Sequence, residues 1–401
     1  MDPHETRRAM SRARAYATAG AGIARIALAG LALLVAGCAT VVEKPKFLEM
    51  MWPEPPLTPR IKFARTLASE LDLGREKSVA ETIVSVVVGK KPDVGHLAEP
   101  MAIAVSDDGQ RIFVSDYGQG RIYRFDLEQK RVTFMGNGRP FNYPFGVALD
   151  AAESLYVVEQ GTRMIRVYDR AGNDLKTITD SSLVRPTGIA IDRKRGRIYV
   201  ADPARSDSPE HSVKVFDLDG ALVGKIGKAK GDCDGCLYFP TYVAVGPDGN
   251  VYVTSTMSAS VNVFEPEGKF VRRFGERGTG FGMFDRPKGV AFDGFGNLYV
   301  VDSGWSNVQI FNPKGEVLLF FGGRGSYPGL LKNPSGIAID GKNRIYVGDF
   351  LNYRLSVYDL VNTTGADSFI APPPENSKGG ETTPRTSRGA GTIQTTQKEK
   401  K

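Results

Sequence analysis

The stretch Pro287-Lys288-Gly289-Val290-Ala291-Phe292-Asp293, followed by Gly296-Asn297-Leu298-Tyr299-Val300, is one copy of a unit that recurs along this chain. Each copy runs from a proline through a small residue and an apolar pair to a turn and a second apolar strand. Six such units open at prolines spaced by 44, 42, 54, 47 and 47 residues, namely Pro100, Pro144, Pro186, Pro240, Pro287 and Pro334. A repeat of this length with strand-like alternation is typical of propeller blades rather than helical solenoids. The sequence therefore predicts an all-β fold, a six-bladed β-propeller.

Each complete unit predicts four strands, but the last unit stops after its third strand, at residues 355–359. We expect the segment 60–67 to supply the missing outer strand, because joining the chain ends in one blade removes open edges and closes the ring at six. The propeller then covers residues 60–361. Glycine two residues after the proline, as at Gly289, is expected to let the backbones approach the central channel closely.

The first 37 residues have the features of an export signal. Five arginines, the last of them Arg25, precede an apolar run over residues 26–35. This run is too short to span a membrane, which takes about 20 residues. Leu34-Val35-Ala36-Gly37-Cys38 resembles the lipobox of bacterial lipoproteins. The resemblance implies cleavage before Cys38 and palmitate or similar acyl chains on that residue, and Ala39 behind it favours the outer membrane. Two alternatives are an uncleaved anchor over residues 19–37 and an ordinary signal peptide with a chance cysteine.

Three further segments lie outside the repeats. Residues 38–59 are rich in proline and predict an extended, semi-rigid tether. Ser78-Val79-Ala80-Glu81 has capping-box spacing and predicts a short helix that ends at Gly89. We expect this helix to pack on the propeller rather than lie on a membrane, because it has no basic face. Residues 362–401 are polar and poor in aromatic residues, and predict a disordered tail.

The net charge of +7 gives no support to nucleic-acid binding once it is divided along the chain. Residues 1–37 contribute +3 and the tail from Val361 contributes +2, so the segment 38–360 is near +2. A basic stripe or patch is the usual mark of a nucleic-acid-binding domain, and a body so close to neutral does not predict one.

Two cysteines remain besides Cys38, namely Cys233 and Cys236. An even pair in an exported protein predicts a disulfide. The bond is either a clip that stiffens a loop or a redox-active pair of the thioredoxin type. A loop rich in Gly and Asp stands where such enzymes have a helix N-terminus, which favours the clip. A haem-attachment motif has a histidine directly after the second cysteine, and this chain has Leu237 there. The cysteine pair therefore does not predict haem attachment.

Segments 274–287 (FGERGTGFGMFDRP), 321–336 and 114–122 (VSDYGQGRI) resemble NHL repeats. The resemblance spans roughly residues 97–360. Together with the lipobox, the chain is similar to bacterial lipoproteins that carry six-bladed NHL propellers. The resemblance implies the fold but constrains function weakly, because the family includes ligand-binding ectodomains, RNA-binding modules, protein-interaction scaffolds and a few lyases.

An acidic residue stands near the predicted end of most second strands. The acidic residues are Asp116, Glu159, Asp202, Asp302 and Asp349, and Ser255 takes this position in the fourth unit. If the blades superpose, these residues form a near-ring of carboxylates on one face of the disc, which could attract a cation such as Ca²⁺. Alternatively, each Asp accepts hydrogen bonds from the backbone of its own turn, and repetition in every blade favours this reading. We include Asp116, Asp302 and Asp349 in the candidate ligand-binding set.

Departures from the repeat are the better guide to function. Tyr242 replaces the glycine of the Pro-x-Gly motif in the fourth blade, and we expect it to project toward the mouth of the channel. Tyr117, Phe145, Trp305 and Phe350 fall in loops or strand ends on the same predicted face. Exposed aromatic residues beside polar groups suit a peptide or glycan surface. The alternative is that most of them pack between blades.

No catalytic or metal-binding residue is assigned. After Cys38 the chain has only His96 and His211, on separate loops, and neither a Gly-x-Ser-x-Gly elbow nor a phosphate loop. The sequence therefore predicts a lipid-anchored propeller of the cell envelope that binds a protein, peptide or glycan without catalysis, cofactor or nucleic acid. The alternative is a calcium- or zinc-dependent lyase or lactonase at the channel mouth. A third option is a redox module that uses the cysteine pair.

Overall fold

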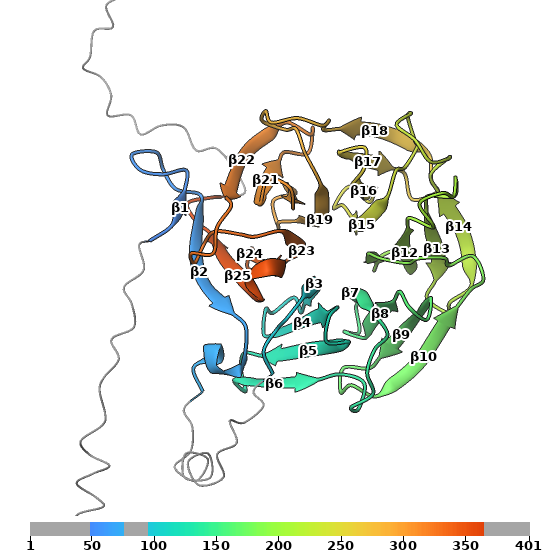
Figure 1. The fold of residues 1–401 in the computed structure, drawn as a ribbon, viewed down its shortest axis with the longest axis horizontal. Helices are drawn as coiled ribbons and strands as arrows, with labels where there is room; N and C mark the ends of the chain where they lie inside the picture. Colours follow the sequence, from blue (N-terminus) through green and yellow to red (C-terminus); the bar gives the residue numbers. More distant parts are fainter. Residues whose placement is uncertain (1–48, 76–94, 365–401) are drawn as a thin grey trace, which may run out of the picture. The chain divides into compact units, whose positions relative to one another are not determined.

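The computed structural model describes residues 49–75 and 95–364. The predicted signal with Cys38, the helix predicted from Ser78 and the tail from residue 365 lie outside the described residues. The described part of the chain belongs to one compact unit. Almost all of its regular structure is β-strand, in six sheets arranged as the blades of a propeller (Figure 1). Neither short helix of the described ranges has the length and apolarity needed to cross a bilayer.

The first five blades are antiparallel four-stranded sheets, each built from consecutive strands. Blade 1 contains β3 (Pro100–Val105), β4 (Arg111–Asp116), β5 (Arg121–Asp126) and β6 (Arg131–Phe134). Blade 2 contains β7 (Pro144–Leu149), β8 (Leu155–Glu159), β9 (Met164–Tyr168) and β10 (Asp174–Thr179). Blade 3 contains β11 (Ile189–Asp192), β12 (Arg197–Asp202), β13 (Ser212–Asp217) and β14 (Leu222–Ile226). Blade 4 contains β15 (Pro240–Val245), β16 (Val251–Ser255), β17 (Ser260–Phe264) and β18 (Phe270–Phe274). Blade 5 contains β19 (Pro287–Phe292), β20 (Leu298–Asp302), β21 (Asn307–Phe311) and β22 (Val317–Gly322).

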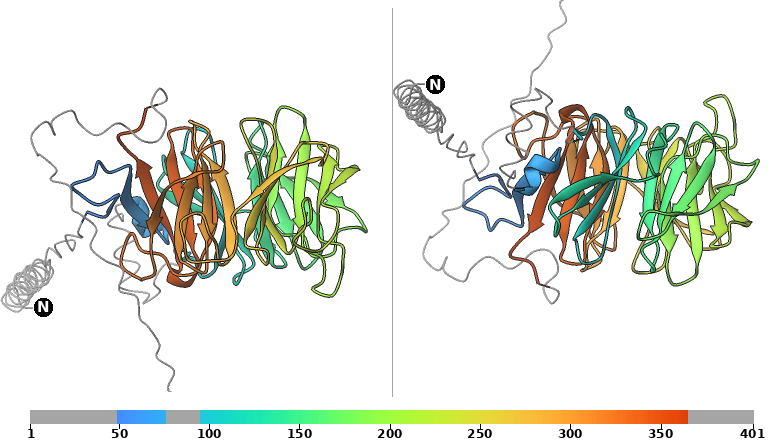
Figure 2. Two further views of the ribbon diagram at one scale, coloured as in Figure 1. Left: turned by 90° about the horizontal axis from the view of Figure 1, so that it is seen from above. Right: turned by 90° about the horizontal axis from the view of Figure 1, so that it is seen from below.

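Blade 6 joins the two ends of the described chain. Its strands are β23 (Pro334–Ile339), β24 (Arg344–Asp349), β25 (Arg354–Leu360), β2 (Ile61–Leu67) and β1 (Met51–Trp52). β2 runs antiparallel to β25, with Lys62 opposite Asp359 and Thr66 opposite Ser356. The blue β2 therefore lies beside the red β25 in Figures 1 and 2, and the ring contains no blade with a missing outer strand among the described residues.

The end of the predicted tether is part of the propeller rather than an extended spacer. β1 pairs with β2, and the ring centroid of Trp52 lies 5.8 Å from that of Tyr358 and 6.0 Å from that of Phe321. A large indole is more stable packed on these two rings than exposed in water, which explains why the chain docks here. Two short 3₁₀ helices complete the described structure, η1 (Glu70–Leu73) after β2 and η2 (Phe350–Asn352) after β24.

Apolar and aromatic side chains from facing blades form the core. Tyr299 on β20 and Tyr346 on β24 are fully buried, and their hydroxyls donate to the carboxylates of Asp293 and Asp340 at 3.1 and 3.0 Å. The repeated tyrosine thus satisfies its polar atom inside the core, as a buried phenol must.

The first strands approach one another too closely for side chains at the predicted glycine positions. A Cβ on Gly289 would lie 2.6 Å from the Ser335 carbonyl oxygen of the next blade, and one on Gly146 would lie 2.4 Å from the Thr187 carbonyl oxygen. The close approach expected at these glycines is confirmed. We call the face that carries the loops between second and third strands, and the loops between blades, the upper face. The opposite face carries the first hairpins of the blades.

Candidate functional site

Tyr242 occupies the channel instead of projecting from its mouth. Its side chain is buried and its hydroxyl donates a 2.7 Å hydrogen bond to the Met101 carbonyl oxygen, on β3 of the opposite blade. Burial raises the pKa of Tyr242 well above its ordinary value, so the phenol remains a hydrogen-bond donor. The expectation that Tyr242 is presented to a ligand is wrong, because a phenol anchored across the ring is more stable than one in water.

Two other predicted aromatic residues join Tyr242 in a plug on the upper side of the channel. Phe145 is buried with its ring 5.7 Å from that of Tyr242, and Tyr117 follows at 6.3 Å from Phe145. Tyr117 is half-buried, and its ring lies 5.2 Å from that of the exposed Tyr143. Phe350 is half-buried at the start of η2 in blade 6 and makes no aromatic contact with the plug. We call Tyr117, Phe145 and Tyr242 the channel plug.

An ion pair spans three blades on the opposite face. The Arg193 guanidinium, from the first hairpin of blade 3, donates to both carboxylate oxygens of Asp107 in blade 1, at 2.9 and 2.8 Å. It also donates to the Leu149 carbonyl oxygen of the intervening blade. The channel is therefore filled by aromatic side chains toward one face and bridged by this pair at the other.

The near-ring of acidic residues holds the loops rather than a ligand. Asp302 is fully buried and accepts backbone N–H bonds from Asp285, Arg286, Gly304 and Trp305 at 2.7 to 3.1 Å. Asp116 likewise accepts backbone N–H bonds from Ala98, Glu99 and Gln119. Asp349 accepts from the Lys332 backbone N–H and from the side chains of Asn352 and Arg354. These carboxylates are not available to a partner, because the blade uses their oxygens to fasten the loop that enters it.

The described residues provide no cluster of metal ligands. No group of three or more His, Cys, Asp or Glu side chains within residues 49–75 and 95–364 is arranged to hold an ion. His211 is buried with its ring against those of Tyr238 and Phe239, and this burial lowers its pKa. His211 therefore contributes mainly to packing in the insertion of blade 3.

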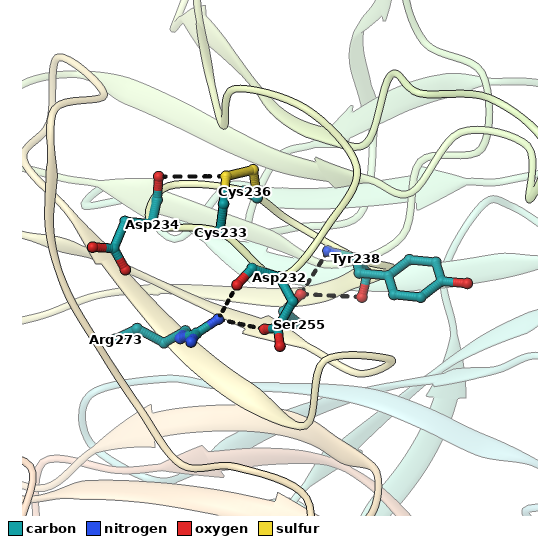
Figure 3. The surroundings of a disulfide bond; sticks show 7 residues. All are labelled: Asp232, Cys233, Asp234, Cys236, Tyr238, Ser255 and Arg273. Carbon is teal, nitrogen blue, oxygen red and sulfur yellow. Dashed lines mark hydrogen bonds and ion pairs between the residues drawn. A yellow bond between two sulfur atoms is a disulfide. The ribbon is translucent and has the colours of Figure 1, made fainter.

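Cys233 and Cys236 form a disulfide, in the loop that enters blade 4 (Figure 3). The Cys236 N–H donates to the Cys233 carbonyl oxygen at 2.9 Å, which closes a tight turn. The same turn closes between Gly280 and Met283 in blade 5, at 3.1 Å. Beside the disulfide, the Arg273 guanidinium donates to the Asp232 carbonyl oxygen and carboxylate. The bond thus fastens a turn that another blade forms without cysteine, which favours the clip over a redox pair.

The remaining predicted aromatic residue lines a separate cavity of about 350 Å³ on the outer part of blade 5. Trp305 is 40% exposed and donates its indole N–H to the Gly278 carbonyl oxygen at 3.0 Å. Phe281 and Phe320, which are 77% and 42% exposed, line the same cavity with their ring centroids 5.5 Å apart. We call Phe281, Trp305 and Phe320 the aromatic pocket.

Polar groups of β21 form part of the wall. Gln309 is buried and uses both ends of its amide, accepting from the Gly282 N–H at 3.0 Å and donating to the Met283 carbonyl oxygen at 2.8 Å. These bonds fix the loop that carries Phe281 against β21. Asn307 also lines the cavity, and its buried Oδ1 has no hydrogen-bond partner among the described residues. The pocket therefore combines aromatic walls with polar side chains of β21.

The aromatic pocket is not a requirement of the repeat. Strand register and the shared turn place Asp234, Ser258 and Arg273 of blade 4 at the positions of Phe281, Trp305 and Phe320. In blade 6 the same positions hold Pro328, Asn352 and Thr66. Because these blades fold without the aromatic residues, the three rings of blade 5 are explained better by binding than by the fold.

Of the three pocket residues, only Trp305 belongs to the set predicted from the sequence. Phe281 stands alone between glycines in Gly280-Phe281-Gly282, where it has no strand neighbours to bury it. Phe320 belongs to the apolar outer strand β22, whereas the matching position in β18 is Arg273. A comparison with the outer strand of blade 4 would have marked Phe320 as an exposed apolar residue, although blade 1 has the exposed Phe134 at the same position.

Comparisons with known proteins agree with this architecture. The chain is 26% identical over 140 residues to protein brain tumor of Drosophila melanogaster and 33% identical over 109 residues to the E3 ubiquitin-protein ligase NHLRC1 of Homo sapiens. These matches cover 34% and 27% of this chain but only 12% and 25% of those proteins. No protein-family model matches the chain.

Solved structures show the same fold at low sequence identity. A protein of unknown function from Bacteroides thetaiotaomicron aligns with a TM-score of 0.55 and 15% identity, over 75% of each chain. A gluconolactonase from Xanthomonas campestris aligns with a TM-score of 0.51 and 20% identity, over 74% of this chain and 98% of its own. At these identities the likeness concerns the fold alone. With the NHL-repeat relatives and six sheets in one ring, the chain is an NHL-type six-bladed β-propeller.

Proposed function

We propose that this chain is a non-catalytic binding protein of the cell envelope that holds a protein or peptide partner in the aromatic pocket of blade 5. The observation that carries the proposal is the exposure of three aromatic side chains around one cavity, at positions where blades 4 and 6 have no aromatic residue. Propellers with NHL-repeat relatives suggest protein-binding scaffolds, which supports the same class of function. The filled channel and the absence of a ligand cluster in the described ranges give no specific support to a metal-dependent lyase or lactonase, so we do not propose one.

Binding in this pocket would follow from burial of surface that the free protein leaves in water. Large aromatic side chains in a desolvated pocket are the residues that most often dominate an interface, each at about 2 kcal/mol or more. Phe281 and Phe320 supply apolar walls, and Trp305 is already oriented by its bond to Gly278.

We expect the triple substitution Phe281→Asp, Trp305→Ser and Phe320→Arg to weaken partner binding at least 100-fold while the protein stays folded. The new residues are those of blade 4 at the same positions, so they are compatible with the repeat. The partner is first identified by photo-crosslinking from position 281 in intact cells, and its Kd is then measured with purified proteins. Val271→Arg changes another exposed apolar residue, on β18 outside the pocket, and serves as the control. Equal affinity of the triple variant and the wild-type protein would overturn the proposal.

The envelope location rests on the lipobox-like segment that ends at Cys38. Several acyl chains on this residue would hold the propeller at a membrane, because each buried CH₂ contributes about 0.8 kcal/mol. We expect the mature protein to begin at Cys38 and to carry the mass of acyl chains, and Cys38→Ser to move the protein from the membrane to the soluble fraction. An unmodified mature N-terminus in an intact-mass measurement would contradict the anchor without affecting the pocket.

A further inference from the structure

Two further cavities lie in other blades than the aromatic pocket. Cavities of about 480 and 340 Å³ adjoin where blade 1 passes into blade 2, and Arg139 lines both. The backbone N–H of Arg139 donates to the Gly136 carbonyl oxygen at 2.8 Å, which fixes the turn that carries this side chain. We call the two cavities together the arginine groove. Neither the aromatic pocket nor the channel plug contributes a residue to it.

The cations of the groove differ in how far they are neutralised. Arg166 pairs with the buried Glu159 at 2.5 Å, and Lys176 donates to the Leu218 carbonyl oxygen, so both are engaged within the fold. The guanidinium groups of Arg121 and Arg139 have no hydrogen-bond or carboxylate partner in the described part of the chain. Only one acid, the exposed Asp174, lines the two cavities. Within the described residues, the positive charges of Arg121 and Arg139 are therefore not compensated.

Arg121 is held in an unusual way for its place in the repeat. Its guanidinium lies 4.8 Å from the centre of the Phe134 ring. Arg354 stands at the same position of blade 6, where it instead pairs with Asp349 at 3.0 Å. In blade 1 the neighbouring Asp116 accepts backbone N–H groups only, so Arg121 is left free for another anion. A guanidinium stacked on an aromatic face keeps its N–H edge available for a ligand.

We infer that the arginine groove binds a phosphate-bearing ligand. Two free guanidinium groups offer planar pairs of N–H donors, which match phosphate oxygens in a bidentate geometry. Phe134, Met135 and Pro140 line the same cavity and would contact the non-ionic part of the ligand. The phosphate could belong to a soluble phosphate ester or to a lipid headgroup, and the chemistry of recognition is common to both. This site is independent of the aromatic pocket, so either proposal can fail alone.

The test measures binding of inorganic pyrophosphate to the full-length protein by calorimetry at low ionic strength. The variant Arg121→Gln/Arg139→Gln removes both free cations. Arg131→Gln removes one exposed charge from the outer strand of the same blade, outside both cavities, and is the matched control. We expect at least a tenfold increase in Kd for the double variant and less than a twofold change for the control. Raising the salt concentration is expected to weaken binding of the wild-type protein.

A second arm distinguishes the source of the phosphate. Flotation with vesicles of phosphatidylcholine, with and without phosphatidylglycerol, compares the same three full-length proteins, so any contribution of the N-terminal segment is common to all. Pyrophosphate binding that the double variant loses supports the inference with a soluble ligand. Binding that requires phosphatidylglycerol and is lost in the double variant supports it with a lipid headgroup. No binding in either arm, or equal binding by the double variant and the control, overturns it.

Discussion

Replacing Tyr242 by glycine is expected to lower the free energy of unfolding by about 3–5 kcal/mol, the usual loss when a large buried aromatic side chain is removed. The backbone itself should accept glycine, because most other blades have glycine at this position. The loss therefore comes from the side chain: the contact with Phe145 disappears and the Met101 carbonyl oxygen loses its donor. Urea unfolding followed by circular dichroism measures the effect.

The conservative change Tyr242→Phe separates the two contributions. It keeps the ring against Phe145 and removes only the hydroxyl, so we expect a smaller loss, of about 1–3 kcal/mol for an unsatisfied buried carbonyl group. Partner binding should be unchanged in both variants as long as they are folded, since Tyr242 lies in the channel and not in the aromatic pocket. A glycine variant as stable as the wild-type protein would show that the plug does not stabilise the ring.

The fold could be predicted because its causes repeat. The proline and the apolar second strand recur in each unit, and the small residue at the channel recurs in each unit except the fourth, so chance similarity in one unit does not mislead. The glycine at position 289 has a local physical cause, a neighbouring carbonyl group at 2.6 Å from a Cβ, and such causes act in the same way in each blade. The outer strand β2 followed from the same logic, because a blade with three strands leaves an open edge.

The site could be predicted only in part. The sequence shows which side chains depart from the repeat, but it does not show what they contact in the folded protein. Tyr242 was recognisable as an exception, but its partner Met101 is 141 residues away and no local pattern links them. Trp305, Phe281 and Phe320 come from three different segments and form one cavity only after the blade has folded. Asp302 illustrates the opposite case, since its repetition in the chain reflected a structural role.

Asp302→Ala is expected to lower the free energy of unfolding by about 3 kcal/mol or more. The carboxylate accepts four backbone N–H groups, from the loop that enters blade 5 and from the turn that follows β20. Alanine would leave these donors buried without an acceptor, and each unsatisfied group costs about 1–3 kcal/mol unless water reaches it. Because Trp305 is one of the four donors, the substitution should also loosen the aromatic pocket and weaken partner binding.

The chain itself provides the control for this effect. Blade 4 has Ser255 at the corresponding position, and its hydroxyl accepts from the Tyr238 N–H at 2.7 Å and donates to the Tyr238 carbonyl oxygen at 3.0 Å. Asp302→Ser should therefore keep one link to the incoming loop and lose less stability than Asp302→Ala. Denaturant unfolding of the two variants tests this order. If alanine and serine are equally stable and within 1 kcal/mol of the wild-type protein, the carboxylate does not fasten the blade, and its recurrence along the chain would need another cause.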